Sequence, residues 1–157
     1  MTMTRLSAPI QLRLAQETDL PALDAMDQQA HANRFILQTG LRQHRQNLVN
    51  PDITYLVIEH NGERCGYSIL VLETGNHSVE LRRILIDQHH RGIGQIALAM
   101  IEGYCRQRWH AERIWLDVFA DNAVARHIYQ KSGYQQFREE HHEARRLLFL
   151  EKALESC

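Results

Sequence analysis

The first part of the chain carries one strand pattern followed by two helical patterns. Apolar and polar residues alternate in 10–14, which is typical of a strand with one buried face. Capping residues at 18–19, followed by Pro21, predict a helix that starts there. A weaker helical pattern extends over 35–48 and is ended by Pro51. The chain is therefore expected to open with a strand and two helices.

The middle of the chain is richer in strand patterns. Segments 53–60 and 64–72 flank Asn61-Gly62, a pair that tolerates positive φ at both turn positions and so predicts an antiparallel hairpin. A further strand is predicted at 78–86. The glycine turn Gly92-Ile93-Gly94 then leads into a long amphipathic helix that ends near residue 108.

The last third predicts a strand, a short helix and a closing hairpin. The strand is predicted at 114–118. The helix is capped by Asp121-Asn122 at its start and ended by Ser132-Gly133. The hairpin is predicted to consist of 134–140 and 145–150. The predicted order is βααβββαβαββ. Because a strand, turn, helix and strand in succession require a parallel crossover pair, the fold class is α+β, with a mixed, mostly antiparallel central sheet flanked by helices.

Composition limits the classes of protein that this chain can represent. With 157 residues, 44% hydrophobic and 24% charged, residues 1–157 are expected to form a single domain. The 18 basic and 19 acidic residues give a net charge of −1 without a basic run, so no nucleic acid partner is expected. No apolar run is long enough to cross a membrane and residues 1–8 lack a secretory pattern, so a cytoplasmic protein is expected. Three cysteines far apart predict reduced thiols.

The glycine turn is the first candidate for chemistry. Backbone N–H groups at a strand-to-helix turn, together with the helix dipole, favour an anion such as a pyrophosphate. The turn is not a dinucleotide-binding fingerprint, because Ala97 stands where the third glycine would be, and no Gly-Lys-Ser/Thr follows for a P-loop. Taken by itself, the turn predicts either a phosphate site or only a tight connection.

Three motifs in register narrow these alternatives. Residues 79–86, followed by His89-His90-Arg91 and the glycine turn, resemble the acetyl-CoA-binding motif of the GNAT superfamily of N-acetyltransferases. Residues 10–15 and 18–21 resemble its opening strand and helix. A third motif is similar to its NxxAxxxYxKxGF-like helix and the strand before it, and consists of Trp115-Leu116-Asp117-Val118, Asn122, Ala125, Tyr129, Lys131, Gly133 and Tyr134. Together the motifs cover nearly the whole chain.

Three departures from the family pattern are visible. His89 stands where the family usually has Arg or Gln, and Tyr134 stands where it usually has Phe. The loop after Ile86 is also shorter than usual. The departures concern side-chain contacts with a phosphate more than the backbone cradle, so the resemblance still implies cofactor binding.

The resemblance implies a GNAT-like acyl-CoA N-acyltransferase fold and an enzyme that transfers an acetyl group from acetyl-CoA to a primary amine. The acceptor would be a small molecule or a peptide, and the transfer direct, within a ternary complex and without a metal. Pantetheine would lie along the strand that ends at Ile86, and the pyrophosphate on the backbone amides of residues 91–95. The residues implied in cofactor binding are Ile84, Leu85, Ile86, His89, Arg91, Gly92, Ile93, Gly94, Gln95, Asn122 and Arg126.

The resemblance also suggests the catalytic groups. Tyr129 would donate a proton to the departing thiolate, which a neutral phenol can do; alternatively it is a buried core aromatic. A backbone N–H near Leu85 or Ile86 would face the thioester oxygen. Glu80 is a candidate base because strand alternation would put it on the same face as Ile86; alternatively it forms an ordinary ion pair with Arg82.

Several readings stay open at the level of sequence. A non-catalytic acyl-CoA-binding regulatory or interaction module is the main alternative, and a longer acyl group is a third. The acidic pair Asp24 and Asp27 would either attract a cationic amine or lie on a solvated helix face. The pairs His89-His90 and His141-His142 lack metal-ligand spacing, so no metal is predicted. Cys105 is expected to pack, and exposed strand edges in the last hairpin would permit a homodimer.

Overall fold

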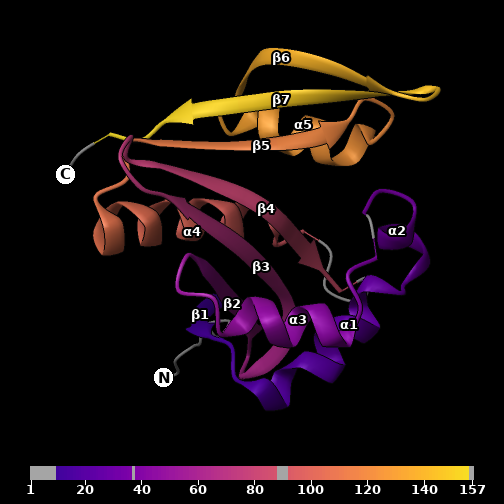
Figure 1. Cartoon of the computed structure of the whole chain (residues 1–157), viewed down its shortest axis with the longest axis vertical. Helices are drawn as coiled ribbons and strands as arrows, with labels where there is room; N and C mark the ends of the chain where they lie inside the picture. The colour runs from indigo at the N-terminus through magenta and orange to yellow at the C-terminus, as the bar shows by residue number, and fades with distance from the viewer. Residues whose placement is uncertain (1–9, 37, 88–91, 156–157) are drawn as a thin grey trace, which may run out of the picture.

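The computed structural model describes residues 10–36, 38–87 and 92–155 as a seven-stranded sheet with helices on both faces (Figure 1). The strands are β1 (Ile10–Leu14), β2 (Ile53–His60), β3 (Glu63–Glu73), β4 (Ser78–Ile86), β5 (Arg113–Phe119), β6 (Gln135–His142) and β7 (Arg145–Ala153). The helices are η1 (Glu17–Asp19), α1 (Leu20–Asp27), α2 (Ala30–Asn33), α3 (Leu41–Leu48), α4 (Gly94–Trp109) and α5 (Ala123–Lys131). The predicted α+β class is confirmed.

The strand order is β1-β2-β3-β4-β5-β7-β6, and every neighbouring pair is antiparallel except β4 and β5. This parallel pair is joined by α4, as the predicted crossover requires. Its pairing involves only Ser78–Glu80 on β4 and Arg113–Trp115 on β5. Beyond these residues the two strands separate (Figure 1), so the sheet is open between them in the shape of a V.

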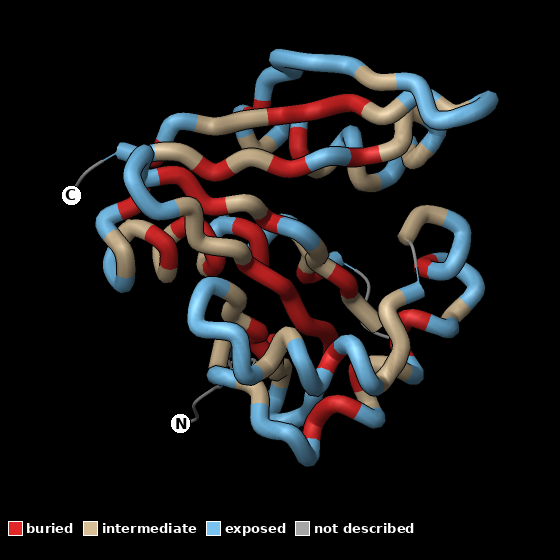
Figure 2. The backbone as a smooth tube through the Cα atoms, viewed as in Figure 1, coloured by how far each residue is buried: buried red, intermediate tan, exposed pale blue. Residues whose placement is uncertain are grey.

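Two layers of helices cover the sheet. On the first face, which we call the α1/α3 face, Leu20 and Leu23 pack against Tyr55, Tyr67 and Ile69. On the opposite α4/α5 face, helix residues such as Leu98 and Ile101 pack against strand residues of β3, β4, β5 and β7. Buried residues follow the middle of β3, and β6 is exposed along almost its whole length (Figure 2).

The start of the second predicted helix is wrong. The pattern in 35–48 predicts a helix that begins at Phe35, but α3 begins at Leu41 and is preceded by the separate short helix α2. Gly40 adopts a positive φ of 84°, and the side chain of Thr39 accepts a hydrogen bond from Arg83 of β4. A contact with another element therefore overrides the local helical tendency before residue 41, and the predicted order lacks α2 and η1.

A buried polar network ties the α1/α3 layer to the sheet. Asp27 and His44 are both fully buried, and His44 Nε2 lies 2.9 Å from an Asp27 carboxylate oxygen. The hydroxyl of Tyr67 donates to Asp27 at 2.5 Å, and Arg83 Nη1 lies 3.3 Å from the same carboxylate. The other ring nitrogen of His44 lies 2.6 Å from the hydroxyl of Tyr55. Asp27 therefore lies in the core, so the reading of it as a residue on a solvated helix face is wrong, while the attraction of a cationic amine stays a prediction.

An irregularity in β4 reverses one expectation about faces. Ile69 is paired with Arg83, but the next residue, Leu70, is paired with Leu81, so Arg82 is an extra residue in β4. A bulge of this kind shifts the alternation of side chains by one position. Glu80 consequently lies on the α1/α3 face, whereas Ile86 packs on the other face. The expectation that they share a face is wrong.

Gly66 is required where β3 passes β4. A Cβ at this position would overlap the carbonyl oxygen of Leu85 in the neighbouring backbone. We expect Gly66→Ala to lower the free energy of unfolding by about 1–3 kcal/mol, as overpacking does elsewhere, measured by urea denaturation. Gly103→Ala in α4 is the control, because the added methyl would meet only Arg106 at 3.8 Å. Equal stability of the two variants would show that β4 moves aside without strain.

The two described cysteines are buried thiols, as expected from the sequence. Cys65 and Cys105 are free and buried, and burial raises their pKa values to about 11 and about 12. Both are therefore thiols at neutral pH, and the packing role predicted for Cys105 is confirmed. Among the described residues, no helix combines the length and apolar character that crossing a membrane requires.

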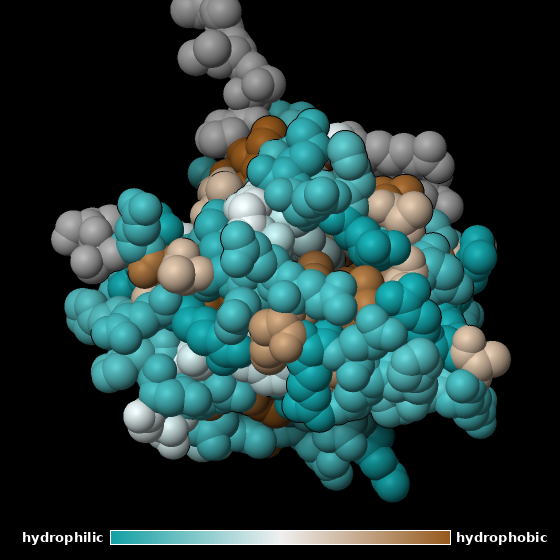
Figure 3. Space-filling view, turned by 90° about the horizontal axis from the view of Figure 1, so that it is seen from above, coloured by the Kyte–Doolittle hydropathy of each residue, from teal (hydrophilic) through white to brown (hydrophobic). Residues whose placement is uncertain are grey.

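The exposed edge of the sheet is polar. Seen from the β6 side, the surface is mostly hydrophilic with small, separate apolar spots (Figure 3). Charged residues of β6 are engaged with neighbours, among them Glu139, which lies 2.9 Å from Arg146, and Glu140, which pairs with Arg138. Charged side chains on an edge strand discourage unwanted strand pairing. The homodimer stays a prediction.

Candidate active site

A cleft of about 680 Å³ lies between the end of β4, the start of α5 and the short helix α2. It lies along the part of β4 beyond the residues that pair with β5. Its lining is mainly apolar, with polar groups from Asp121, Asn122 and the backbone of β4. The predicted cofactor and catalytic residues that line it are Ile84, Leu85, Ile86, Gly92, Gly94, Asn122 and Tyr129. Three segments that are far apart in sequence thus contribute to one cavity.

Peptide groups of β4 alternate between β3 and the cleft. The N–H of Asp87 donates to Cys65 at 2.7 Å, and the carbonyl of Leu85 is directed at Gly66. Both residues therefore point their backbone groups at β3. Because successive residues of a strand point these groups to opposite sides, Ile84 and Ile86 direct theirs into the cleft. Of the two N–H groups considered for a thioester oxygen, that of Ile86 faces the cleft and that of Leu85 does not.

The glycine turn and the start of α4 form the second part of the site. Gly92 has a φ of 91°, and open space surrounds the position of a Cβ there. The N–H of Ala97 donates to Ile93 at 2.8 Å, so the preceding N–H groups of the helix have no acceptor within it. These groups and the helix dipole suit an anion. The predicted contacts of His89 and Arg91 lie outside the described residues.

Ile93, Gln95 and Arg126 do not line the cleft. Ile93 is buried against Ala97 and neighbouring strand residues, so its side chain belongs to the core. Arg126 donates to the carbonyl of Ala120 at 2.8 Å, which holds it at the start of α5. Ile93 could therefore contact a cofactor only through its backbone, whereas the side chains of Gln95 and Arg126 are exposed.

Asn122 has a structural role that is compatible with binding. Its side-chain oxygen accepts from the N–H of Ala125 at 3.3 Å and caps α5. The same side chain lines the cleft. Its amide nitrogen is not used by the cap, so the residue can present a donor to a ligand arm.

Tyr129 projects from α5 into the cleft and is only 8% exposed. Burial, and to a lesser degree the negative charge of Asp117, raise the pKa of its phenol above the usual range. The hydroxyl therefore keeps its proton at any ordinary pH. The ring also packs 5.6 Å from that of Tyr134. Tyr129 thus combines a core contact with a protonated group in the cleft.

Glu80 is mostly buried and forms an ion pair with Arg82, whose Nη2 lies 3.0 Å from a Glu80 oxygen. The ion pair predicted as the alternative is therefore present. Glu80 occupies the last position of β4 that pairs with β5, opposite Trp115. Its carboxylate lies on the α1/α3 face, at the narrow end of the V.

Asp117 is the residue that sequence reasoning missed. It lies on β5 two residues beyond Trp115, so it shares a face with Trp115 and with Glu80. Its side chain is exposed, but partial desolvation by nearby protein atoms raises the pKa of its carboxyl, and the negative charge of Glu80 adds to the effect. The charge of Asp117 also acts on Tyr129. A single acidic residue between Leu116 and Val118 was the only signal available in the sequence.

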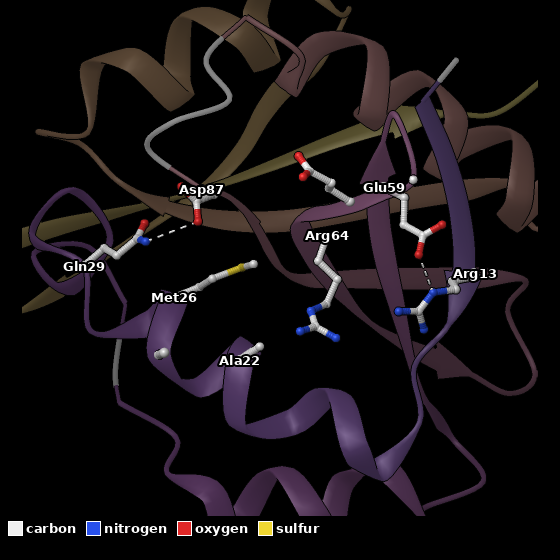
Figure 4. A pocket seen from close by; sticks show the side chains of 10 residues that line it. Arg13, Ala22, Met26, Gln29, Glu59, Arg64 and Asp87 are labelled. Carbon is white, nitrogen blue, oxygen red and sulfur yellow. Dashed lines mark hydrogen bonds and ion pairs between the residues drawn. The ribbon is translucent and has the colours of Figure 1, made fainter. Parts of the chain in front are cut away.

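A second cavity of about 670 Å³ lies between α1 and the β2–β3 hairpin (Figure 4). Arg13 and Glu59 pair at one end at 2.7 Å, and Gln29 donates to Asp87 at the other. The buried carboxylate of Asp19 binds Arg13 and Arg64, and these contacts lower its pKa. Most of the charged side chains around this cavity form ion pairs or hydrogen bonds with one another. We assign the cavity no step of a reaction.

The described residues contain one cluster with possible metal ligands, formed by Asp24, Asp27 and His44. Asp27 and His44 already belong to the buried network, in which the cationic Arg83 also contacts Asp27. His141 and His142 lie near Glu139 and Glu140 at the exposed end of β6. None of these groups lies in the cleft, and the absence of a metal stays a prediction.

The fold, with its separated parallel strands, glycine turn and helix N-terminus, agrees with the motifs in placing the chain among acyltransferases. The sequence profile of the Acetyltransferase (GNAT) family matches residues 19–134, so the protein belongs to that family. No curated protein sequence matches the chain.

Several solved structures share the fold of this chain. The ribosomal-protein-S18-alanine N-acetyltransferase of Escherichia coli has a TM-score of 0.80 and 18% identity, covering 95% of this chain and 96% of that one. Spermidine N-acetyltransferase of Vibrio cholerae, in complex with CoA and spermine, has a TM-score of 0.81 and 14% identity, covering 92% and 95%. A putative phosphinothricin N-acetyltransferase has a TM-score of 0.76 and 18% identity, covering 94% and 100%.

Proposed function

We propose that the protein transfers the acetyl group of acetyl-CoA to a primary amine, within a ternary complex and without a metal. The observation that carries the proposal is the open V between β4 and β5. It combines backbone groups of Ile84 and Ile86, a protonated phenol from Tyr129 and two carboxylates near its narrow end. Family membership supports the reaction class.

The cleft fits the cofactor in three places. The backbone of Ile84 and Ile86 can pair with the amide groups of the pantetheine arm as a neighbouring strand would. The N–H groups at the start of α4 suit the pyrophosphate. Asn122 can donate to the arm from the opposite wall. The cofactor supplies an activated acetyl thioester, and its cleavage needs a neutral amine, a stabilised oxyanion and a proton for the departing sulfur.

The chain has a group for each requirement. Asp117 or Glu80 accepts the proton that the amine loses as its nitrogen bonds to the acetyl carbon. The N–H of Ile86, or that of Ile84, stabilises the oxyanion. Tyr129 gives its proton to the sulfur as the carbon–sulfur bond breaks. The resulting phenolate then takes up a proton from solvent, and the carboxyl base releases the one it accepted. Asp117 is the better candidate base because its raised pKa brings its proton affinity closer to that of an amine.

The proposed acceptor class is suggested by the structural neighbours. The structural neighbours named above are an alanine N-acetyltransferase for a ribosomal protein and a spermidine N-acetyltransferase. Their acceptors differ in size, but both present a primary amine. We infer an amine-bearing small molecule or a peptide N-terminus for this chain, and alanine-ended peptides and spermidine are the first acceptors to test.

Cofactor binding can be tested at the glycine turn. We expect both acetyl-CoA and CoA to raise the melting temperature of the protein, whereas NAD leaves it unchanged. At 100 times the dissociation constant a ligand adds roughly 2.7 kcal/mol to stability. Gly92→Asp should abolish the shift, because its carboxylate would meet the phosphates.

The control for this test is Gly75→Asp. Gly75 also has a positive φ, of 96°, in the turn that joins β3 to β4 at the end of β4 far from the cleft. This variant should lose intrinsic stability but keep the ligand-induced shift. An equal shift in Gly92→Asp would place the phosphates elsewhere. A normal shift without turnover on any amine would favour the non-catalytic binding module.

A further inference from the structure

The short helix α2 is attached to the cofactor cleft by one side chain. His31 Nε2 lies 2.9 Å from the carbonyl oxygen of Ile86, at the end of β4. His31 lines the cleft together with Ala32, Phe35 and Ile36. Within α2, only Ala32 is buried, whereas His31 and Asn33 are exposed. The ring of His31 is thus a polar link between a small surface helix and the edge of the sheet.

The carbonyl that His31 contacts is one that the cleft offers to a ligand. Leu85 and Asp87 direct their backbone groups at β3, so the carbonyl of Ile86 points into the cleft. A chain that pairs with β4 as an added strand would run about 4.8 Å from it and donate an N–H to this oxygen. A ring nitrogen within hydrogen-bond distance of the same oxygen occupies the space that such a chain needs.

We propose that His31 competes with the pantetheine arm for the carbonyl of Ile86, so that α2 must move away from β4 before the cofactor can bind. This inference depends on the proposed function, because it assumes that the cofactor lies along β4. A contact made only in the free protein lowers the fraction of molecules that can bind, and the apparent affinity falls by the same factor. His31 therefore sets cofactor affinity without touching the bound cofactor.

The kinetics of CoA binding test this competition. The net contribution of one neutral hydrogen bond corresponds to a factor of about 3 to 10 in an equilibrium constant. We expect His31→Ala to raise the association rate constant by about that factor and to leave the dissociation rate constant unchanged. The measurement is stopped-flow fluorescence with etheno-CoA on the full chain, with calorimetry for the dissociation constant.

Two further variants separate the contact from other effects. His31→Gln keeps a side-chain donor, so it should associate nearly as slowly as the natural protein. His127→Ala removes an exposed histidine of α5 that does not line the cleft, and its rate constants should equal those of the natural protein. If His31→Ala is less stable to heat, His31→Phe, which keeps a ring but has no donor, replaces it, and faster association than in the Gln variant is then the expected result.

Each outcome has a definite meaning. Faster dissociation in His31→Ala would show that the ring contacts the bound cofactor, which overturns the proposal. Equal rate constants in the natural protein, the Ala variant and the Gln variant would overturn it while leaving the proposed function intact. If neither the natural protein nor His31→Ala binds CoA, the proposed function falls, and this inference with it. Binding by His31→Ala alone would support both.

Discussion

Tyr129→Phe is expected to reduce kcat by about a factor of 100 to 10,000, the range in which a positioned general acid contributes. The substitution removes only the hydroxyl, so the ring still packs against Tyr134 and the cleft keeps its shape. Without the phenol, the departing thiolate has to take its proton from water. Steady-state kinetics with acetyl-CoA and an amine acceptor measure the effect.

Binding should be nearly unaffected in this variant. The thermal shift with CoA should match that of the natural protein, because the proposed cofactor contacts come from β4, α4 and Asn122. Tyr104→Phe is a matched control, since Tyr104 packs edge-on against Trp109 on α4 and does not line the cleft. Undiminished turnover in Tyr129→Phe would assign the residue to packing alone, the alternative that its sequence context had left open.

Asp117→Asn is expected to lower kcat/KM by about a factor of 100, the lower end of the range for general acid–base catalysis. Partial desolvation and the charge of Glu80 raise the pKa of the exposed Asp117 carboxyl, so the natural enzyme should lose activity as the pH falls through this raised value and the carboxyl becomes protonated. The variant has no such group, and its residual rate should lack that acidic limb. Rate profiles over pH test both statements.

Stability should change in the opposite direction. A carboxyl whose pKa is raised by folding is most favourable when protonated, so its ionised form opposes folding at pH values above that pKa. Asp117→Asn should therefore be more resistant to urea than the natural protein at neutral pH, although it is less active. Glu80→Gln provides the comparison. If only Glu80→Gln loses the acidic limb of the rate profile, Glu80 is the base. Asp117 then acts only through the electrostatic effect of its charge on neighbouring groups.

Elements with strong local signals could be predicted from the sequence. Asn61 and Gly62 both adopt positive φ, as the turn requires, and β4 occupies 78–86 as its pattern indicates. The Tyr134 that replaces a usual Phe donates to the buried Glu102 at 2.8 Å, and this partner explains why a hydroxyl is tolerated there. That partner lies 32 positions away and was not visible locally.

The expectations that failed depended on contacts between distant segments. An extra residue at Arg82 cannot be recognised until β3 is aligned beside β4. Asp27 has the local appearance of a surface residue, and only the arrival of His44, Tyr67 and Arg83 makes its burial favourable. Asp117 became a candidate base only when the pairing of β4 with β5 placed it on the same face as Glu80.

The V between β4 and β5 also has a consequence for the lifetime of the protein in a cell. Backbone pairing across this boundary is confined to Ser78–Glu80 of β4 and Arg113–Trp115 of β5. Strands β1–β4 and β5–β7 are therefore joined only weakly within the sheet. A molecule that fills the opening supplies the missing connection and stabilises the folded state. We expect chains made when that molecule is scarce to open more often at this seam and to be degraded sooner, so that protein abundance follows metabolite supply.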